Sequence, residues 1–150
     1  MADRQVDYAI IGGGQAGFNC ARWLREEGAE GSVLLIGREP DPPYYRPDCS
    51  KDYLRGEKPR QEVPFRPPEF YEEQQIELLR RVSALSLDLA ARQVKLSNRE
   101  AIGFDKALLA TGANVRRLNV PGCDLEGIYY LRTLGNSDSI RENAAGKRVV

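Results

Sequence analysis

Hydrophobic residues occur along the chain in short runs that are separated by glycine-rich and polar turns. The first run, VDYAII at residues 6–11, contains β-branched residues and stops at GGGQAG. After this turn, small and apolar residues recur with helical spacing at Gly17, Cys20, Ala21 and Leu24, which is typical of a helix that packs on a sheet. Gly28 is expected to end that helix, and SVLLIG at residues 32–37 predicts a second buried strand. This part of the chain is therefore predicted to form a strand–helix–strand (βαβ) unit.

The remaining pattern predicts a short helix and several further strands. YEEQQIELLRRV predicts a helix that leads into a strand at residues 76–79. The runs ALSLDL, QVKL and AIGF, with alternating leucines in the first and turn-like AAR and SNRE between them, predict a small antiparallel meander. KALLATG at residues 106–112 predicts another, separate strand. The proline-rich loop at residues 42–57 is expected to be neither helix nor strand, and residues 113–143 are expected to be irregular.

Composition and charge narrow the classes of partner. The chain has 150 residues, of which 41% are hydrophobic and 29% charged, so one domain with a real core is expected. Its 22 basic and 22 acidic residues give no net charge, which argues against nucleic acid and anionic membrane surfaces as partners. The N-terminus lacks the pattern of a signal peptide and no apolar run is long enough to span a membrane, so a cytoplasmic location is expected.

The cysteines and the absence of histidine limit the chemistry. Three widely spaced cysteines and no histidine disfavour both a metal site and a redox dithiol. The absence of histidine also removes the side chain most often used as a general acid or base. Any chemistry that the chain supports is therefore expected to come from a cofactor.

The turn after the first strand carries Gly12, Gly14 and Gly17 in the spacing G-x-G-x-x-G. In this motif the first glycine permits a tight turn, the second lets the backbone approach a pyrophosphate, and the third allows close packing of helix and strand. Its position between a strand and a helix favours dinucleotide binding over a glycine-rich turn that binds nothing. The acidic residue expected to contact the ribose is displaced: Arg38 comes first after Gly37, and Glu39 follows. Arg38 could read a phosphate, stack on an adenine or point into water.

The loop PPYYRPDCSKDYLRGE (residues 42–57) holds two cations of interest, Arg46 and Lys51. Loops collect charged residues in any case, so one interpretation is a solvated connection. The other is that the two side chains are held toward an anionic group.

The order of these features resembles the flavin domain of ferredoxin and rubredoxin reductases, an apoptosis-inducing-factor-like group of the pyridine nucleotide-disulfide oxidoreductase superfamily. The features that carry the resemblance are the glycine turn, RPDCSK, the meander, LLATGANVRRLNVPG and YYLRTL, which span essentially the whole chain. The R-P-x-x-S-K spacing points to the ferredoxin reductase branch. The lack of a C-x-x-x-x-C pair argues against the disulfide-reductase branch. The resemblance implies an α/β, Rossmann-like FAD-binding three-layer fold with an antiparallel β-meander.

The resemblance also implies roles for particular residues. Arg46 matches an arginine that binds the FAD pyrophosphate, and its planar fork suits two phosphate oxygens. Lys51 matches a lysine beside the isoalloxazine ring, where its charge would favour the reduced, anionic flavin, and it is the one residue implied to be catalytic. The backbone of Val82 would meet the adenine, and Arg132 would lie near FAD. The other implied cofactor contacts are Gly12, Gly14, Gln15, Ala16, Gly17, Arg38, Glu39, Ala110, Thr111 and Gly112.

Some features depart from the family pattern. Arg38 stands where family members usually have an acid. Asp48 and Cys49 put a charge and a thiol into a segment that is normally apolar, and Cys49 is interpreted as an unreactive, partly buried cysteine. The chain also ends early, so residues 1–146 are expected to be the N-terminal part of an FAD-binding domain, and residues 147–150 the first strand of an NAD(P)H-binding domain that lies outside this chain. An unpaired sheet edge could then allow self-association.

The function implied is that of an NAD(P)H-dependent FAD oxidoreductase that passes electrons to a small iron-sulfur protein or rubredoxin. The isolated fragment is expected to be inactive. Two alternatives from other classes are a non-catalytic flavin- or nucleotide-binding module and a truncated product without function. The sequence does not choose between NADH and NADPH.

Overall fold

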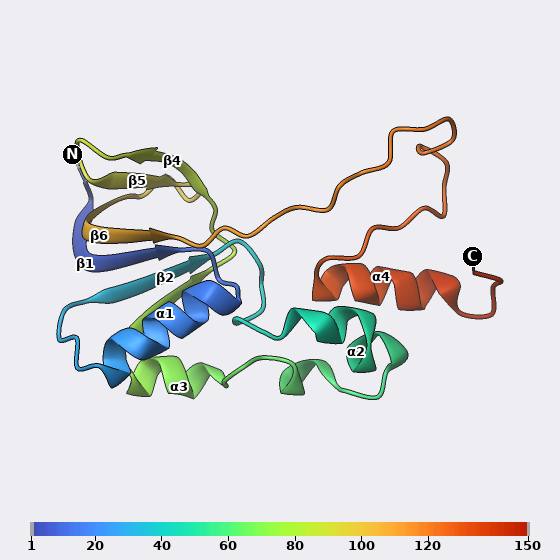
Figure 1. Ribbon diagram of the computed structural model, residues 1–150, viewed down its shortest axis with the longest axis horizontal. Helices are drawn as coiled ribbons and strands as arrows, with labels where there is room; N and C mark the ends of the chain where they lie inside the picture. The colour runs from blue at the N-terminus through green and yellow to red at the C-terminus, as the bar shows by residue number, and fades with distance from the viewer. Residues whose placement is uncertain (1, 150) are drawn as a thin grey trace. The chain divides into compact units, whose positions relative to one another are not determined.

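The computed structural model describes residues 2–149, and these residues pack as two units that are each discontinuous in sequence (Figure 1). Of the described residues, the sheet unit comprises 2–44 and 65–112, and the helical unit comprises 45–64 and 113–149. The division does not test the prediction that residues 1–146 form an FAD-binding domain, which stays a prediction.

The sheet unit contains all six strands of the described residues. Along the chain they are β1 (Arg4–Ile11), β2 (Val33–Gly37), β3 (Ile76–Arg80), β4 (Ala84–Asp88), β5 (Gln93–Leu96) and β6 (Ala101–Leu109). Their order in the sheet is β3-β2-β1-β6-β5-β4. Parallel pairing joins β3, β2, β1 and β6, whereas β4, β5 and β6 pair antiparallel. The predicted βαβ unit and the predicted meander are both confirmed.

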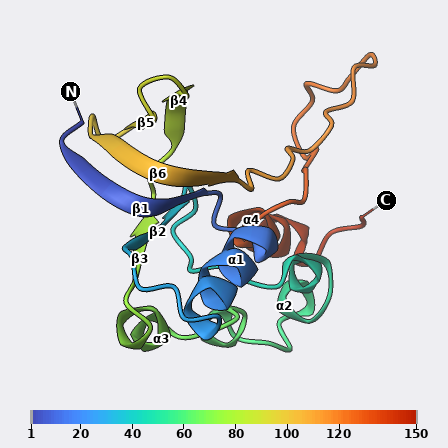
Figure 2. The ribbon, with the colours of Figure 1, turned by 60° about the vertical axis from the view of Figure 1, so that its left-hand side comes forward.

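Two helices cover one face of the parallel strands, as Figures 1 and 2 show. They are α1 (Gln15–Glu26) and α3 (Pro68–Glu73). The buried cluster between helices and sheet includes Phe18 and Ala21 of α1, Tyr71 of α3, and Leu35 of β2. The helical face predicted from the sequence is confirmed, because Gly17 and Ala21 are buried and Cys20 and Leu24 pack against this cluster. Helix α1 ends two residues before Gly28, which has a φ of +79°.

The meander packs over the opposite face of the parallel strands. A second buried cluster joins Val94 and Leu96 of β5 to Leu34 and Ile36 of β2. The sheet therefore curls back on itself, and helices, parallel strands and meander form the predicted three layers. The α/β, Rossmann-like fold class is confirmed.

The prediction of two separate strands at AIGF and KALLATG was wrong. Both runs belong to the single strand β6, whose first residues pair antiparallel with β5 through Gly103. The same strand pairs parallel with β1 over nearly all of its length, from Ile102 to Leu109. Asp105 and Lys106 looked like a break because they are polar, but they are exposed residues within the strand. From Asp105 onward, no residue of the described chain is registered with β6 on its β5 side.

A bulge in β4 changes which of its side chains face the core, compared with the alternation that the leucines predicted. The pairing register with β5 shifts between Ala84 and Ser86. Ala84 and Leu87 consequently pack against the core, whereas Leu85 is 68% exposed. The extra residue of a bulge moves every later side chain to the other face.

The helical unit contains more regular structure than the sequence predicted. The proline-rich loop folds into the 3₁₀ helix η1 (Arg46–Ser50), the single-turn helix α2 (Asp52–Arg55) and the 3₁₀ helix η2 (Arg60–Glu62). Within the segment expected to be irregular, α4 spans Leu134–Ala144. Residues 147–149 form no strand, so the described part of KRVV does not confirm the expected strand, and Val150 lies outside the described residues.

Helix α4 begins with a reciprocal cap. The side chain of Thr133 accepts a hydrogen bond from the backbone N–H of Asn136 at 3.2 Å, and the Asn136 side chain accepts one from the Thr133 N–H at 3.0 Å. Asparagine in place of the usual glutamate or glutamine made this cap difficult to recognise in the sequence. Among residues 2–149, the structure holds no helix with both the length and the apolar character that crossing a bilayer requires.

Candidate functional site

The glycine turn between β1 and α1 combines two closed positions with one open position. A Cβ added at Gly12, where φ is +128°, would lie 2.0 Å from the carbonyl oxygen of Ala110. A Cβ added at Gly17 would lie 2.0 Å from the carbonyl oxygen of Gly12. A Cβ added at Gly14 would meet no heavy atom within 4 Å. Gly12 and Gly17 are therefore required by the fold, whereas the space beside Gly14 is open.

Gly14 also stands at the start of α1. Gly14 is the N-cap residue, and no side chain forms a capping hydrogen bond at this end of the helix. Gln15 and Ala16 are the first helical residues, and both are exposed. The first N–H groups of a helix have no partner within the helix and carry its positive dipole end. An open backbone position beside these N–H groups has the character of a phosphate site. The predicted pyrophosphate contact stays a prediction.

The second predicted turn, ATG, lies directly against the glycine turn. The N–H of Ala110 donates a 2.8 Å hydrogen bond to the backbone carbonyl of Ile11. The N–H of Gly12 donates a 2.9 Å hydrogen bond to the backbone carbonyl of Ile36. Thr111 and Gly112 follow as exposed residues, with Gly112 at a φ of +67°. Two segments that are about a hundred positions apart in sequence thus meet at the carboxyl ends of neighbouring parallel strands.

This edge of the sheet also lies where the strand order reverses, on either side of β1. From β1, the chain continues to β2 and β3 on one side, and β6 lies on the other side. In open α/β sheets, ligands bind outside the carboxyl ends of the strands at such a switch point. The glycine turn and the ATG turn therefore lie at the edge where such folds bind ligands, and their predicted contacts with FAD stay predictions.

Glu39 lies just beyond β2 and is held by a neighbour that the sequence reasoning missed. The hydroxyl of Tyr44 donates a 2.7 Å hydrogen bond to its carboxylate, and the N–H of Arg81 donates one of 3.2 Å to its backbone carbonyl. Arg38, which precedes it, is exposed. The sequence places Tyr44 in the proline-rich loop, and no pattern within that loop indicates its contact with Glu39.

Val82 follows β3 and is buried at the same edge. Its N–H donates a 3.2 Å hydrogen bond to the carbonyl of Gly37, at the end of β2. The predicted backbone contact with an adenine is not tested by this arrangement and stays a prediction.

In the helical unit, the structure brings Arg46 and Arg132 together. Arg46 begins η1, and its guanidinium donates a 3.0 Å hydrogen bond to the backbone carbonyl of Arg132. Lys51 lies five residues later, between η1 and α2, with an exposed side chain. Its N–H donates to the carbonyl of Asp48 at 3.1 Å, and its carbonyl accepts from Arg55 at 2.9 Å.

The two unusual residues of the RPDCSK segment are both buried. Asp48 is 7% exposed and forms an ion pair of 2.7 Å with Lys58. Cys49 is 3% exposed and forms no disulfide bond within the described part of the chain. The charge that departs from the family pattern is thus balanced by a lysine ten positions later in the chain. The burial of Cys49 is consistent with an unreactive thiol.

Comparisons with known proteins identify a family and a set of relatives. Residues 6–150 match the family model described as pyridine nucleotide-disulphide oxidoreductase. Rhodocoxin reductase of Rhodococcus erythropolis is 41% identical over 140 residues, which cover 93% of this chain and 33% of the relative. Rubredoxin-NAD(+) reductase of Pseudomonas putida is 36% identical over 132 residues, covering 88% of this chain and 34% of the relative. The chain therefore spans about a third of the length of these curated relatives.

Solved structures give the same picture. A ferredoxin reductase from Rhodopseudomonas palustris superposes with a TM-score of 0.87 at 38% identity, covering 91% of this chain and 34% of that one. The putidaredoxin reductase–putidaredoxin complex contains a chain that superposes with a TM-score of 0.82 at 32% identity, covering 95% of this chain and 34% of that one.

Proposed function

Because the chain belongs to the pyridine nucleotide-disulphide oxidoreductase family, we propose that it is the FAD-binding part of an NAD(P)H-dependent reductase that passes electrons to a ferredoxin- or rubredoxin-like acceptor. The resemblance inferred from the order of the motifs is confirmed by the family match and by the relatives. The NAD(P)H-dependent reductases of this family are FAD flavoproteins, and FAD is the cofactor that the sequence predicted.

The observation that carries the proposal is the contrast within the glycine turn. The fold closes Gly12 and Gly17 with backbone atoms at 2.0 Å but leaves Gly14 open. A turn that served only to connect β1 with α1 would not need glycine at Gly14, because its φ of −95° is open to any residue. A ligand that touches the backbone supplies the missing reason.

The other predicted contacts have defined roles in this proposal. Gln15 and Ala16 present helix N–H groups to the pyrophosphate, and Glu39 accepts hydrogen bonds from the adenosine ribose. Arg46 and Arg132 are cationic contacts of FAD, and Lys51 lies beside the isoalloxazine ring. Bound FAD would supply the hydride-accepting and one-electron chemistry, and these residues would hold and orient it.

The proposed acceptor class is supported by the names of the relatives. One curated relative is a rubredoxin-NAD(+) reductase, and one structural relative is a putidaredoxin reductase in complex with putidaredoxin. In the proposal, the NAD(P)H site lies outside residues 1–146, and residues 147–150 begin the domain that carries it.

The proposal is tested by FAD titration of the chain and of Gly14→Val, followed by quenching of flavin fluorescence. The parent chain is expected to bind FAD saturably. Gly14→Val is expected to lose this binding, because its branched side chain would fill the open space where the phosphates approach. Its free energy of unfolding should fall by only about 1 kcal/mol or less, the usual effect of replacing a glycine at an N-cap.

Gly17→Ala is the matched control, because its Cβ would collide with the carbonyl of Gly12. It is expected to unfold at a lower denaturant concentration than Gly14→Val. Equal FAD binding by the parent and by Gly14→Val would contradict the assignment of this turn to the cofactor.

A further inference from the structure

The backbone of Lys51 is fixed by its immediate neighbours, but its exposed side chain depends on how the whole segment is held. Lys51 is the last residue before α2 and directly follows η1. Neither element exceeds five residues. Isolated helical turns of this length are not stable on their own, so contacts from elsewhere in the helical unit must keep residues 49–53 in place.

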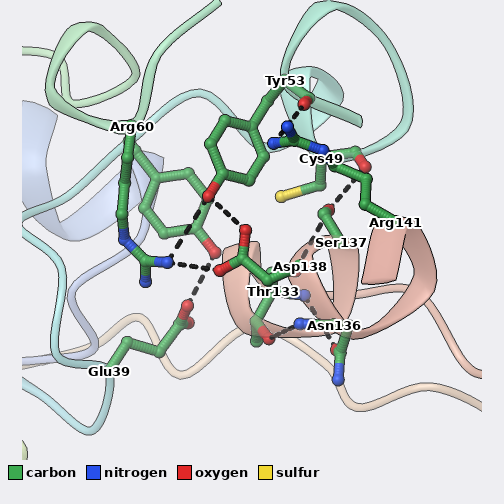
Figure 3. A network of polar contacts seen from close by, with 10 residues as sticks. Glu39, Cys49, Tyr53, Arg60, Thr133, Asn136, Ser137, Asp138 and Arg141 are labelled. Atoms are coloured by element: carbon green, nitrogen blue, oxygen red, sulfur yellow. Dashed lines mark hydrogen bonds and ion pairs between the residues drawn. The ribbon is translucent and has the colours of Figure 1, made fainter. Parts of the chain in front are cut away.

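The first such contact comes from Ser137 in the first turns of α4. Its side chain is fully buried, and its hydroxyl donates a 2.7 Å hydrogen bond to the backbone carbonyl of Cys49. Cys49 lies two residues before Lys51. Figure 3 shows this bond running from α4 to the segment that precedes α2.

The second contact comes from the next residue of the same helix. The hydroxyl of Tyr53 donates a 2.5 Å hydrogen bond to one carboxylate oxygen of Asp138, and Arg60 donates one of 2.5 Å to the other oxygen (Figure 3). Tyr53 lies two residues after Lys51 and is 3% exposed. The guanidinium of Arg141 lies 5.7 Å from the centre of the Tyr53 ring.

The two contacts hold residues on either side of Lys51 in the sequence. Ser137 and Asp138 are consecutive residues of α4, and they hold the residues two positions before and two positions after Lys51. Thr133 and Asn136 cap the same end of the helix, which gives both anchors a fixed base. Ser137 and Asp138 lie outside the motifs that the sequence analysis singled out.

We propose that Ser137 and Asp138 are positioning residues for Lys51, which hold its ammonium group where it tunes the electron affinity of the flavin. The inference rests on the proposed function, in which Lys51 lies beside the isoalloxazine ring. The electrostatic effect of a charge on a neighbouring group falls with distance. If residues 49–53 become mobile, Lys51 keeps its charge but has a weaker effect on the flavin. Loss of either anchor therefore acts in the same direction as loss of Lys51.

The first test requires no cofactor. Hydrogen exchange of the backbone amides of Lys51, Arg55 and Gly56, which are all hydrogen-bonded in this segment, is measured in the flavin-free chain. Ser137→Ala and Asp138→Asn are expected to accelerate exchange at these amides by about tenfold, which corresponds to the loss of one hydrogen bond. Ser139→Ala is the matched control, because Ser139 is an exposed serine of the same helix. Unchanged exchange in both anchor variants would overturn the inference.

The second test measures the reduction potential of the flavin at saturating FAD. Lys51→Ala is expected to make the potential more negative, and Ser137→Ala, Asp138→Asn and Tyr53→Phe are expected to shift it in the same direction by a smaller amount. In the Lys51→Ala background, the anchor substitutions should cause no further shift, because the charge that they position is gone. A purely structural role would give the same shift in both backgrounds and would overturn the inference.

The outcomes separate the inference from the function on which it rests. A shift with Lys51→Ala but none with the anchor variants overturns the positioning role and leaves the proposed function in place. No shift with Lys51→Ala overturns both roles at this segment. Failure of the parent chain to bind FAD at any concentration overturns the proposed function, and the positioning of a flavin-tuning charge with it. Ser137 is fully buried, so Asp138→Asn and Tyr53→Phe decide the matter if Ser137→Ala fails to fold.

Discussion

The hydroxyl of Tyr44 donates a 2.7 Å hydrogen bond to the carboxylate of Glu39, the residue proposed to contact the adenosine ribose. Tyr44 is 2% exposed, so this contact restrains the carboxylate just beyond the end of β2. Tyr44→Phe is expected to weaken FAD binding by up to about tenfold, which corresponds to the loss of one orienting hydrogen bond. Glu39→Ala is expected to weaken it further. Tyr45→Phe is the control, because the adjacent tyrosine is 47% exposed. Unaltered affinity in Glu39→Ala would remove Glu39 from the proposed site.

Arg46→Ala is expected to reduce the affinity for FAD by about 10- to 100-fold, the usual effect of losing hydrogen bonds to a charged group. Arg46→Lys should recover only part of the affinity, because an ammonium group keeps the charge but lacks the planar fork. Equilibrium titration with FAD measures both. Arg55→Ala is the matched control within the same segment, since Arg55 already pairs with Asp52 and Glu57 at the surface. An equal loss of affinity in Arg55→Ala would indicate a general effect of charge.

Tyr71→Phe is expected to stabilise the protein. Tyr71 packs against Phe18 and Phe70, and its buried hydroxyl has no hydrogen-bond partner among the described residues. Burial raises the pKa of this hydroxyl, which therefore stays protonated. Removing an unsatisfied buried hydroxyl should raise the free energy of unfolding by about 1 kcal/mol. Tyr53→Phe is the contrasting variant, because the Tyr53 hydroxyl is bonded to Asp138 and its loss should destabilise. Urea denaturation of both variants measures the difference.

Asp7 is expected to contribute to acid sensitivity. Hydrogen bonds of 2.6 and 2.7 Å from the hydroxyl and the N–H of Ser32 lower the pKa of its carboxyl group in the folded state. Stability from this group is therefore present above the ordinary carboxyl pKa of about 3.9 and is lost as the pH falls through the lower folded value. Asp7→Asn should show a shallower loss of stability between about pH 4 and pH 2 than the parent, as measured by urea denaturation. Ser32→Ala should likewise reduce the loss of unfolding free energy over this pH range. If the pH dependence of stability is unchanged in both variants, Asp7 does not contribute to acid sensitivity.

The 150-residue chain alone is expected to bind FAD weakly and not to oxidise NAD(P)H at a useful rate. Its one G-x-G-x-x-G turn is assigned to FAD, so no second turn is left for the nicotinamide cofactor. Among the described residues, the β6 edge from Asp105 to Leu109 has no partner on its β5 side, and Leu109 is 62% exposed. The test adds excess FAD with NADH or NADPH to the chain and follows nicotinamide absorbance with ferricyanide as the acceptor. Turnover of about ten per second, an ordinary value for enzymes, would show that a second site was missed.

Local features of the sequence determined the first part of the fold and one side of the candidate site. The strand–helix–strand unit follows from apolar runs of the right length and from the helical spacing of Gly17, Cys20, Ala21 and Leu24. The glycine turn follows from the motif and its position between strand and helix. These predictions succeed because the hydrogen bonds and packing that decide them lie within a short stretch of chain.

Only the tertiary structure decided the rest, because distant segments supply the partners. Strand β6 continues through Asp105 and Lys106 because β1 offers a parallel ladder on its other side, which no periodicity within residues 101–109 reveals. Helix α4 has few apolar residues and is held by Ser137 and Asp138, whose partners Cys49 and Tyr53 lie more than eighty residues earlier. The motif identified Lys51, but its restraint depends on hydrogen bonds between segments that are far apart in sequence. A folded chain forms such bonds only after the loops between the segments have closed.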